Sequence, residues 1–305
     1  MTDDRRGGVP VLVLVTALWA VSFPLVGGVV GKDPGENEFV FLSLRFVLAT
    51  LAFLPILPIV IRQGTGRGLQ PWFHGAIIGT MLFFGYWTQT VGLKYTTPSR
   101  SAFVTMLSVP MVPIFAALVH RRRPSLVHLV GSAIAVAGVG IVLAPEGTLE
   151  PNRGDYWTLA CAFVFAVEIL VIARFARQSG AAVLAVAQIA TVAVLSLVGW
   201  KLSSGTMPEL THDFWVAVVV TGILCTTLAI GGMTWAQGRI SAETAAMVFA
   251  LEPVFAGLFE YIYLDRGMNR LQWGGGLVVV FAVAWTSRAP APGDPPGPSA
   301  SAAVR

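Results

Sequence analysis

Four ionisable residues stand inside long apolar stretches of the chain: Arg45, Glu168, Glu252 and Glu260. A charged residue at the centre of a membrane helix costs about 2.5–3.5 kcal/mol on insertion scales, so such residues usually face a cavity or an oppositely charged partner. A carboxyl group in such a place can bind a proton or a cationic group, and a guanidinium can bind a carboxylate. These residue types therefore predict a polar site within an apolar surrounding.

Glu252 lies near the middle of its apolar stretch and directly precedes Pro253. Because proline has no backbone N–H, the carbonyl of Phe249 should lose its helical partner, and the helix should kink there. Glu252 could satisfy this irregular backbone, or it could bind a proton or a cationic group of a substrate. Glu168 could act likewise or pair with a basic residue. Glu252 and Glu168 are therefore our candidates for proton coupling.

Arg45 lies closer to one end of its apolar stretch. Its long side chain could reach the membrane surface, or it could meet Glu260, which we place in the same half of the membrane. We favour a structural ion pair between Arg45 and Glu260 over a contact with substrate.

Polar and aromatic residues recur at helical spacing in the same stretches. Each one alone has an ordinary explanation, because Ser and Thr bond back to helix carbonyls while Trp and Tyr are common at membrane surfaces. Together they favour a partly polar cavity, to which Thr90 and Thr226 would also contribute. The candidate substrate-binding residues are Trp19, Ser22, Phe23, Tyr86, Gln89, Thr105, Ser108, Glu168, Trp235 and Glu252.

These residues must be positioned by secondary-structure elements that are stable in a lipid bilayer. The chain of 305 residues is 55% hydrophobic and only 12% charged, with a mean hydropathy of +0.73, whereas soluble domains are about 25% charged. Its apolar stretches are long enough to cross roughly 30 Å of hydrocarbon as helices, and they lack the alternation of barrel strands. We predict an all-α integral membrane protein with ten transmembrane helices, near residues 11–30, 39–61, 72–92, 99–119, 126–143, 156–173, 181–200, 214–236, 242–264 and 271–287.

The loop charges predict the orientation, because Lys and Arg are retained on the cytoplasmic side. One set of alternate loops is rich in arginine, including Arg121, Arg122 and Arg123, and the other set holds most of the carboxylates. We therefore expect a multi-pass protein of the cell membrane, the inner or plasma membrane, with both termini cytoplasmic. Residues 1–10 would form the cytoplasmic N-terminus, and the Pro-rich residues 289–305 a disordered cytoplasmic tail.

The chain also contains a weak internal repeat. A shift of 143 residues aligns Pro110 with Pro253 and Gly131 with Gly274. We predict two five-helix repeats, residues 11–144 and 154–288. Since five is an odd number of crossings, the second repeat would be inverted relative to the first, which is typical of carriers that expose one site alternately to either side.

The sequence resembles the EamA-type transporters of the drug/metabolite transporter (DMT) superfamily over nearly its whole length. The resemblance rests on these segments: Leu18-Trp19-Ala20 with Ser22-Phe23, Arg45-Phe46, Gly92-Leu93-Lys94-Tyr95-Thr96, Pro110, Gly131, Gly138-Val139, Gly154-Asp155, Ala236-Gln237 and Leu251-Glu252-Pro253-Val254-Phe255-Ala256. It implies a ten-helix carrier with a central cavity, for substrates that include amino acids and are often exported. We therefore predict a secondary transporter that moves a small metabolite, such as an amino acid, by alternating access, energised by the substrate gradient or by proton exchange.

Two other classes of membrane protein stay open as alternatives, an embedded enzyme and a channel. The sequence has no HExxH zinc motif, no GxSxG nucleophile elbow and no Walker motif. It also lacks a recognisable filter loop or ring of charges. We expect the partners to be a small-molecule substrate and the lipid bilayer, and we expect no enzyme activity, cofactor, metal or nucleic-acid partner; the oligomeric state stays open.

Overall fold

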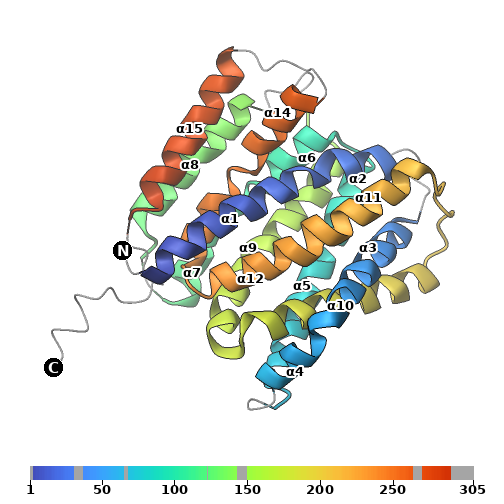
Figure 1. The fold of residues 1–305 in the computed structure, drawn as a ribbon. Helices are drawn as coiled ribbons and strands as arrows, with labels where there is room; N and C mark the ends of the chain where they lie inside the picture. Colours follow the sequence, from blue (N-terminus) through green and yellow to red (C-terminus); the bar gives the residue numbers. More distant parts are fainter. Residues whose placement is uncertain are drawn as a thin grey trace, which may run out of the picture.

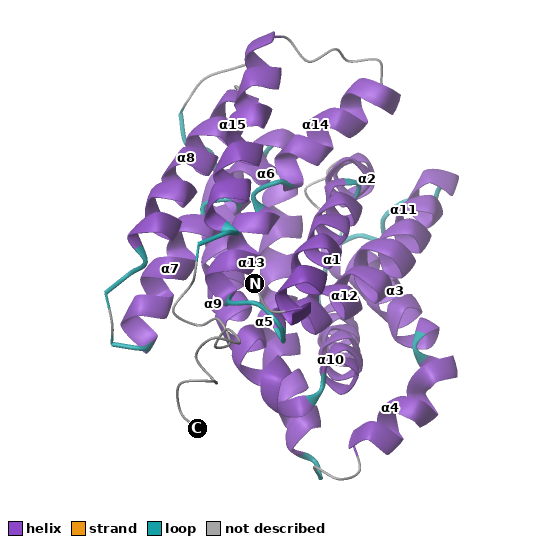
Figure 2. Cartoon of the chain, turned by 60° about the vertical axis from the view of Figure 1, so that its left-hand side comes forward, coloured by secondary structure: helices purple, strands orange, loops and turns teal. Residues whose placement is uncertain are grey.

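The computed structural model describes residues 3–30, 37–64, 68–121, 123–142, 150–263 and 270–289, and helices are the regular elements that make up this part of the chain (Figure 2). In chain order they are α1 (Asp3–Ala20), α2 (Ser22–Val30), α3 (Glu38–Ala52), the 3-10 turn η1 (Leu54–Ile56), α4 (Leu57–Gly64), α5 (Gln70–Leu93), α6 (Pro98–Thr105), α7 (Ser108–Val119), α8 (Leu126–Val142), α9 (Arg153–Ser179), α10 (Ala181–Leu202), α11 (His212–Gly222), the π-helical η3 (Ile223–Leu228), α12 (Ala229–Gln237), α13 (Ala242–Phe249), α14 (Glu252–Tyr263) and α15 (Arg270–Thr286).

The all-α prediction is confirmed for the described residues, and six helical segments are long and apolar enough to cross a membrane. Several of them join two labelled helices across a short break. They cover Gly7–Val30, Arg100–Val119, Arg153–Ser179, Ala181–Leu202, His212–Gln237 and Ala242–Phe259. The other stretches in which we predict crossings are also helical, although α8 and α15 have only 17 residues each. The count of ten crossings therefore stays a prediction.

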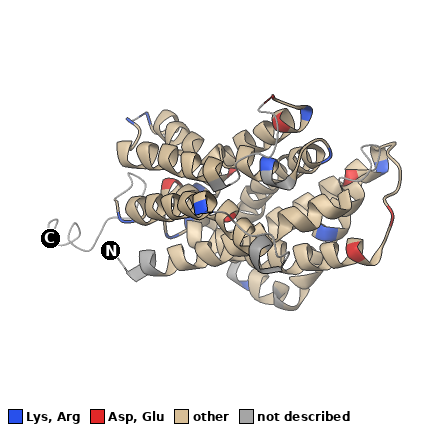
Figure 3. Cartoon of the chain, turned by 90° about the horizontal axis from the view of Figure 1, so that it is seen from above, with Lys and Arg blue, Asp and Glu red and all other residues tan. Residues whose placement is uncertain are grey.

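Charged side chains collect towards the loops and helix ends, and long parts of the helices carry none (Figure 3). Large apolar side chains instead point outward from the helices, among them Leu14, Phe73, Leu118 and Phe163. Exposed apolar surface of this extent is unfavourable in water but is what a helix presents to lipid tails.

Two of the apolar segments are broken near their middle. Helices α6 and α7 are separated by Met106 and Leu107, and helices α13 and α14 by Ala250 and Leu251. In each segment a proline follows within the first turn of the second helix, where its missing N–H is tolerated. The kink that Pro253 predicts next to Glu252 thus takes the form of a full break, and Glu252 becomes the first residue of α14.

The helix ends of the two halves coincide when the chain is shifted by 144 residues. Helices α6, α7 and α8 then cover the same positions as α13, α14 and α15. Their first caps also match, because Thr97 and Ser241 each accept a hydrogen bond from the backbone N–H three residues later. This register differs by one residue from the shift of 143 that aligns Pro110 with Pro253.

Helix α5 packs along α9 in the antiparallel direction. Gly92, near the end of α5, lies against Thr158 near the start of α9, and Gly85 lies against Phe165 one to two turns further along. Glycine lets the two helix backbones approach closely at these points.

The same arrangement recurs between α1 and α12, which also pack together (Figure 1). Gly8 lies against Ala236, and Gly232 lies against Val15, so these helices are antiparallel as well. In both pairs a helix of one half packs on a helix of the other half.

Helices α8 and α15 lie side by side at one edge of the molecule (Figure 1). Gly131 meets Thr286, and Gly138 meets Val279, so the two helices run in opposite directions. They occupy equivalent positions in the two halves.

Candidate functional site

Three charged side chains are buried where the long helices meet in the middle of the molecule. Arg45 of α3 is 2% exposed, Glu168 of α9 is 3% exposed, and Glu252 at the start of α14 is 7% exposed. Tyr86 of α5 lies within electrostatic range of all three. Four elements from both halves of the chain therefore bring these groups together.

The guanidinium of Arg45 is held from two sides. Its Nε donates a hydrogen bond of 2.8 Å to Oγ1 of Thr226. Its central carbon lies 4.6 Å from the ring centroid of Tyr86 and 5.4 Å from that of Phe46, within the range of cation–π attraction. The buried Nη2 has no hydrogen-bond partner among the described residues. The expected partner Glu260 has a side chain outside the described part, so the ion pair stays a prediction.

The position of Thr226 depends on the π-helical turn η3. Its hydroxyl donates to the carbonyl of Thr221, five residues earlier, at 2.8 Å, and Thr227 bonds in the same way to Gly222 at 3.0 Å. An extra residue in the turn rotates the following side chains, and such turns are frequent at functional sites. The oxygen of Thr226 is thereby free to accept the hydrogen bond from Arg45.

Trp19 forms part of the wall beside η3. Its Nε1 donates to the carbonyl of Cys225 at 2.8 Å, and its ring lies 5.3 Å from that of Phe249, centroid to centroid. The hydroxyl of Ser22 donates back to the carbonyl of Trp19 at 2.7 Å, next to the break between α1 and α2. Phe23 is buried in the next turn.

The two carboxylates differ in their surroundings. Glu252 stands at the N-terminus of α14, where the helix dipole favours negative charge. Oε1 of Glu168 is buried and has no hydrogen-bond partner in the described part of the chain. Cys161 lies within electrostatic range of both carboxylates.

Three further predicted residues lie at or beside the break between α6 and α7. Gln89 of α5 donates to Oγ1 of Thr105 at 3.4 Å, and Ser108 is buried as the first residue of α7. Under the shift of 144 residues Ser108 is the counterpart of Glu252. The two broken helices therefore present a hydroxyl and a carboxyl at equivalent points.

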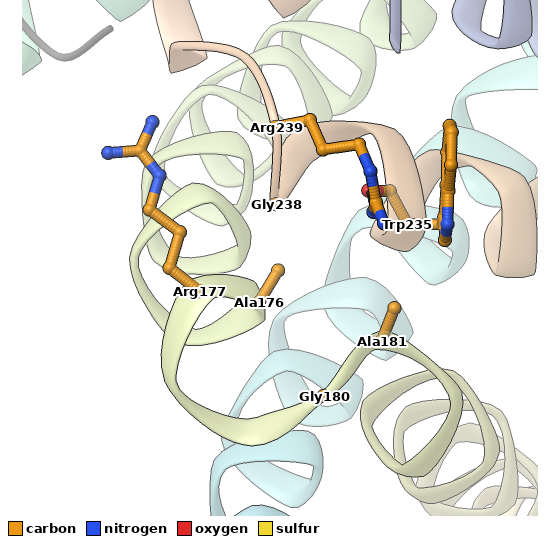
Figure 4. A pocket seen from close by; sticks show the side chains of 7 residues that line it. All are labelled: Ala176, Arg177, Gly180, Ala181, Trp235, Gly238 and Arg239. Carbon is orange, nitrogen blue, oxygen red and sulfur yellow. Dashed lines mark hydrogen bonds between the residues drawn. The ribbon is translucent and has the colours of Figure 1, made fainter. Parts of the chain in front are cut away.

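Trp235 does not join this central group. It lies about 13 Å further along the helix axis than Thr226, is 36% exposed, and stacks against the guanidinium of Arg239 at 3.8 Å. Figure 4 shows the two side chains facing each other, with Arg177 pointing away from them. Together with Gly180 they line a pocket of about 360 Å³ at the helix ends.

A second pocket, of about 370 Å³, opens among the ends of α7, α9 and α13. His120, Arg174 and Arg177 give its rim a basic character, and Glu243 lies in the same lining. The central charges are not part of the lining of either pocket.

Sequence reasoning named most members of the central group but missed how they are held. The thiol of Cys225 donates to the carbonyl of Leu18 at 3.0 Å, and the carbonyl of Cys225 accepts from Trp19. A run of small hydroxyl and thiol residues, Cys225-Thr226-Thr227, is the one local signal for this turn.

The apolar helices and the buried charges between them define a multi-pass membrane protein of the transporter type. The sequence model of the EamA-like transporter family matches residues 6–144 and again residues 152–288. The chain therefore belongs to the EamA-like transporter family, and several of its relatives are named as transporters.

Among these relatives, an uncharacterized transporter of Archaeoglobus fulgidus is 30% identical, over 89% of this chain and 83% of its own. A probable biotin transporter of Pseudomonas aeruginosa is 26% identical over 91% of this chain and 96% of its own. A probable terminal-alkyne amino-acid exporter of Streptantibioticus cattleyicolor is 25% identical over 91% and 92%. One crystal structure of 20% identity matches the fold with a TM-score of 0.71, covering 94% of this chain and 97% of that one.

Proposed function

We propose that this protein is a secondary carrier that exports a small metabolite, an amino acid or a related compound, across the cell membrane by alternating access. Ten transmembrane helices would form two inverted repeats, residues 11–144 and 154–288, with both termini in the cytoplasm. The observation that carries this proposal is the central group of Arg45, Glu168 and Glu252, whose burial within the membrane favours a substrate or ion site.

The packing between the halves supports the inverted repeat. The helix ends match under one shift, α5 packs on α9 as α12 packs on α1, and α8 lies antiparallel to its counterpart α15. A pseudo-two-fold axis in the membrane plane would relate the two halves in this way, because it pairs each helix with an antiparallel counterpart. Such an axis lets one structure open the same site towards either side. The breaks in α6–α7 and α13–α14 provide points where the halves can bend.

The names of two relatives support the substrate class. One is named for biotin and another for an amino acid, and both kinds of compound are small carboxylic acids. In the central group, a carboxylic acid substrate would lie beside the guanidinium of Arg45 and the carboxyl groups of Glu168 and Glu252. Export in place of import agrees with the exporter among the relatives.

Proton exchange is the coupling that the site favours. Glu252 and Glu168 are buried carboxyl groups on separate helices. Protonation of either one would change the charge of the site, and alternating access would expose that site to each side of the membrane in turn. Transport driven by the substrate gradient alone is the alternative.

The proposal is tested by uptake of labelled amino acids and other small carboxylic acids into proteoliposomes that hold the purified protein. We expect saturable uptake above that of empty liposomes, and a change in rate when a pH gradient is imposed. Flux that rises linearly with concentration would indicate a channel, and conversion of the label to a new compound would indicate an enzyme.

A further inference from the structure

The Nη2 group of Arg45 is a buried donor to which the described residues offer no acceptor. Thr226 occupies Nε, and the rings of Tyr86 and Phe46 lie against the guanidinium. Nη2 is buried and has no partner in the described part of the chain. A buried donor that carries charge and lacks a partner costs several kcal/mol unless something pairs with it.

The buried carboxylates of the central group do not form an ion pair with Arg45 in the described part of the chain. Glu168 from α9 and Glu252 from α14 lie within electrostatic range of the same tyrosine, yet the ion pairs of the described residues do not include Arg45. Glu168 likewise keeps an unpartnered oxygen. Arg45 and Glu168 therefore each keep a buried polar atom to which the described residues give no partner, and a bound ligand could supply one.

We propose that Nη2 of Arg45 binds the carboxylate of the transported compound, so that the substrates of this carrier are carboxylate-bearing metabolites. This inference rests on the proposed function, because it takes the central group as the substrate site. A guanidinium suits a carboxylate by charge and by planar geometry, and such charge-assisted hydrogen bonds are about twice as strong as neutral ones.

Thr226 is a positioning residue for this contact. By holding Nε it fixes the direction in which Nη2 points, and the aromatic faces of Tyr86 and Phe46 restrict the guanidinium to one plane. Thr226 would act on the substrate only through Arg45.

The test compares acids with their amides, which have the same shape but lack the negative charge. L-leucine with L-leucinamide, L-phenylalanine with L-phenylalaninamide, and butyrate with butyramide are titrated into the full-length protein in lipid nanodiscs. Binding is followed by the shift of the thermal unfolding midpoint. We expect at least one acid to bind about tenfold or more tightly than its amide, as one charged hydrogen bond would give.

Four variants locate the source of this preference. Arg45→Gln should abolish the preference for the acid, and Arg45→Lys should retain part of it because the charge remains. Thr226→Val should reduce it, because the guanidinium keeps its charge but loses the hydrogen bond that orients it. Thr221→Val is the matched control, because the buried hydroxyl of Thr221 donates to the carbonyl of Ala217 in its own helix; it should leave the preference unchanged.

The outcomes separate this inference from the proposed function. If the wild-type protein binds acids and amides equally, or if Arg45→Gln and Arg45→Lys keep the full preference while folded, the inference is wrong, although saturable transport could still hold. If the acid preference depends on Arg45 but proteoliposomes show no saturable flux, Arg45 binds carboxylates and the carrier proposal fails.

Discussion

The charges in the middle of this protein and those at one end of its helices are arranged in opposite ways. At the helix ends, Glu38 binds Nζ of Lys94 at 2.7 Å and Nε1 of Trp87 at 3.0 Å. Arg100 binds both carboxylate oxygens of Asp155, at 2.7 and 2.6 Å. In the central group, by contrast, charges from different helices share Tyr86 as a neighbour, and Nη2 of Arg45 and Oε1 of Glu168 have no hydrogen-bond partner among the described residues.

We infer from this difference that the charges at the helix ends have a structural role and that the central charges have a functional one. The paired charges at the helix ends tie α3 to α5 and α6 to α9, and Asp155 also completes the cap of α9 with Asn152. Their electrostatic energy is used in holding helices together. The described residues include no ion pair of the central charges, and we therefore expect these charges to bind a substrate or a proton.

The largest expected effect concerns Glu252. Glu252→Gln keeps the size of the side chain and removes its ability to ionise, so we expect the response of uptake to an imposed pH gradient to disappear while the protein stays folded. The measurement is initial uptake at several gradients. Glu209→Gln, which changes an exposed loop carboxyl, should behave like the wild type; an unchanged pH response of Glu252→Gln would reject its role in coupling.

At the helix ends, removal of Lys94 should affect stability instead of transport. Lys94→Met leaves the carboxylate of Glu38 in a partly buried place without its cation, and loss of one partner of a buried pair costs about 3 kcal/mol. Thermal unfolding in detergent should show this loss, while substrate affinity of the folded variant stays at the wild-type value. Lys201→Met removes an exposed lysine and is the control. A shift in affinity without a shift in stability would contradict the comparison.

Arg100→Gln should have a smaller effect of the same kind. The pair with Asp155 is bidentate but partly exposed, with side-chain exposures of 24% and 14%, so solvent screens it and a loss of about 1–2 kcal/mol is expected. Asp155 keeps its capping bond to the backbone N–H of Asn152 at 2.8 Å in the variant. Unfolding of Arg153→Gln, an exposed arginine two residues before Asp155, provides the reference.

The smallest effect is on the pH dependence of stability, through Glu38 at the start of α3. Partial burial tends to raise the pKa of Glu38, but the hydrogen bonds and charge of Lys94, with the bond from Trp87, outweigh it and leave the pKa below its usual value of 4.5. The stabilisation is therefore present above pH 4.5 and is lost as the pH falls through the lowered pKa. Wild-type unfolding should lose stability in that acidic range, and Glu38→Gln should lose less; parallel curves for the two proteins would show that the pair does not contribute.

The helices and the irregularity at Glu252 could be predicted from the sequence, because the length of an apolar stretch and the effect of a proline on helix geometry are local properties. It also indicated the burial of Arg45, Glu168 and Glu252, since charges are rare in such stretches, but it did not indicate that of Glu243, which is 3% exposed near the start of α13. It did not predict the contact between Arg45 and Thr226, which are 181 residues apart, because that contact depends on a π-helical turn and on tertiary packing. Trp235 shares the helical spacing of the lining residues, but its distance along the helix places it with Arg239 near the surface.

Counterflow in proteoliposomes tests the central claim most directly. Vesicles holding the wild-type protein or Arg45→Gln are loaded with an unlabelled carboxylic acid that the uptake panel identifies, and a trace of the same labelled compound is added outside. A carrier with its site at the central charges predicts transient accumulation of label above equilibrium in the wild type and its loss in folded Arg45→Gln. Label that only equilibrates in the wild type, or equal overshoot in both proteins, would contradict the account.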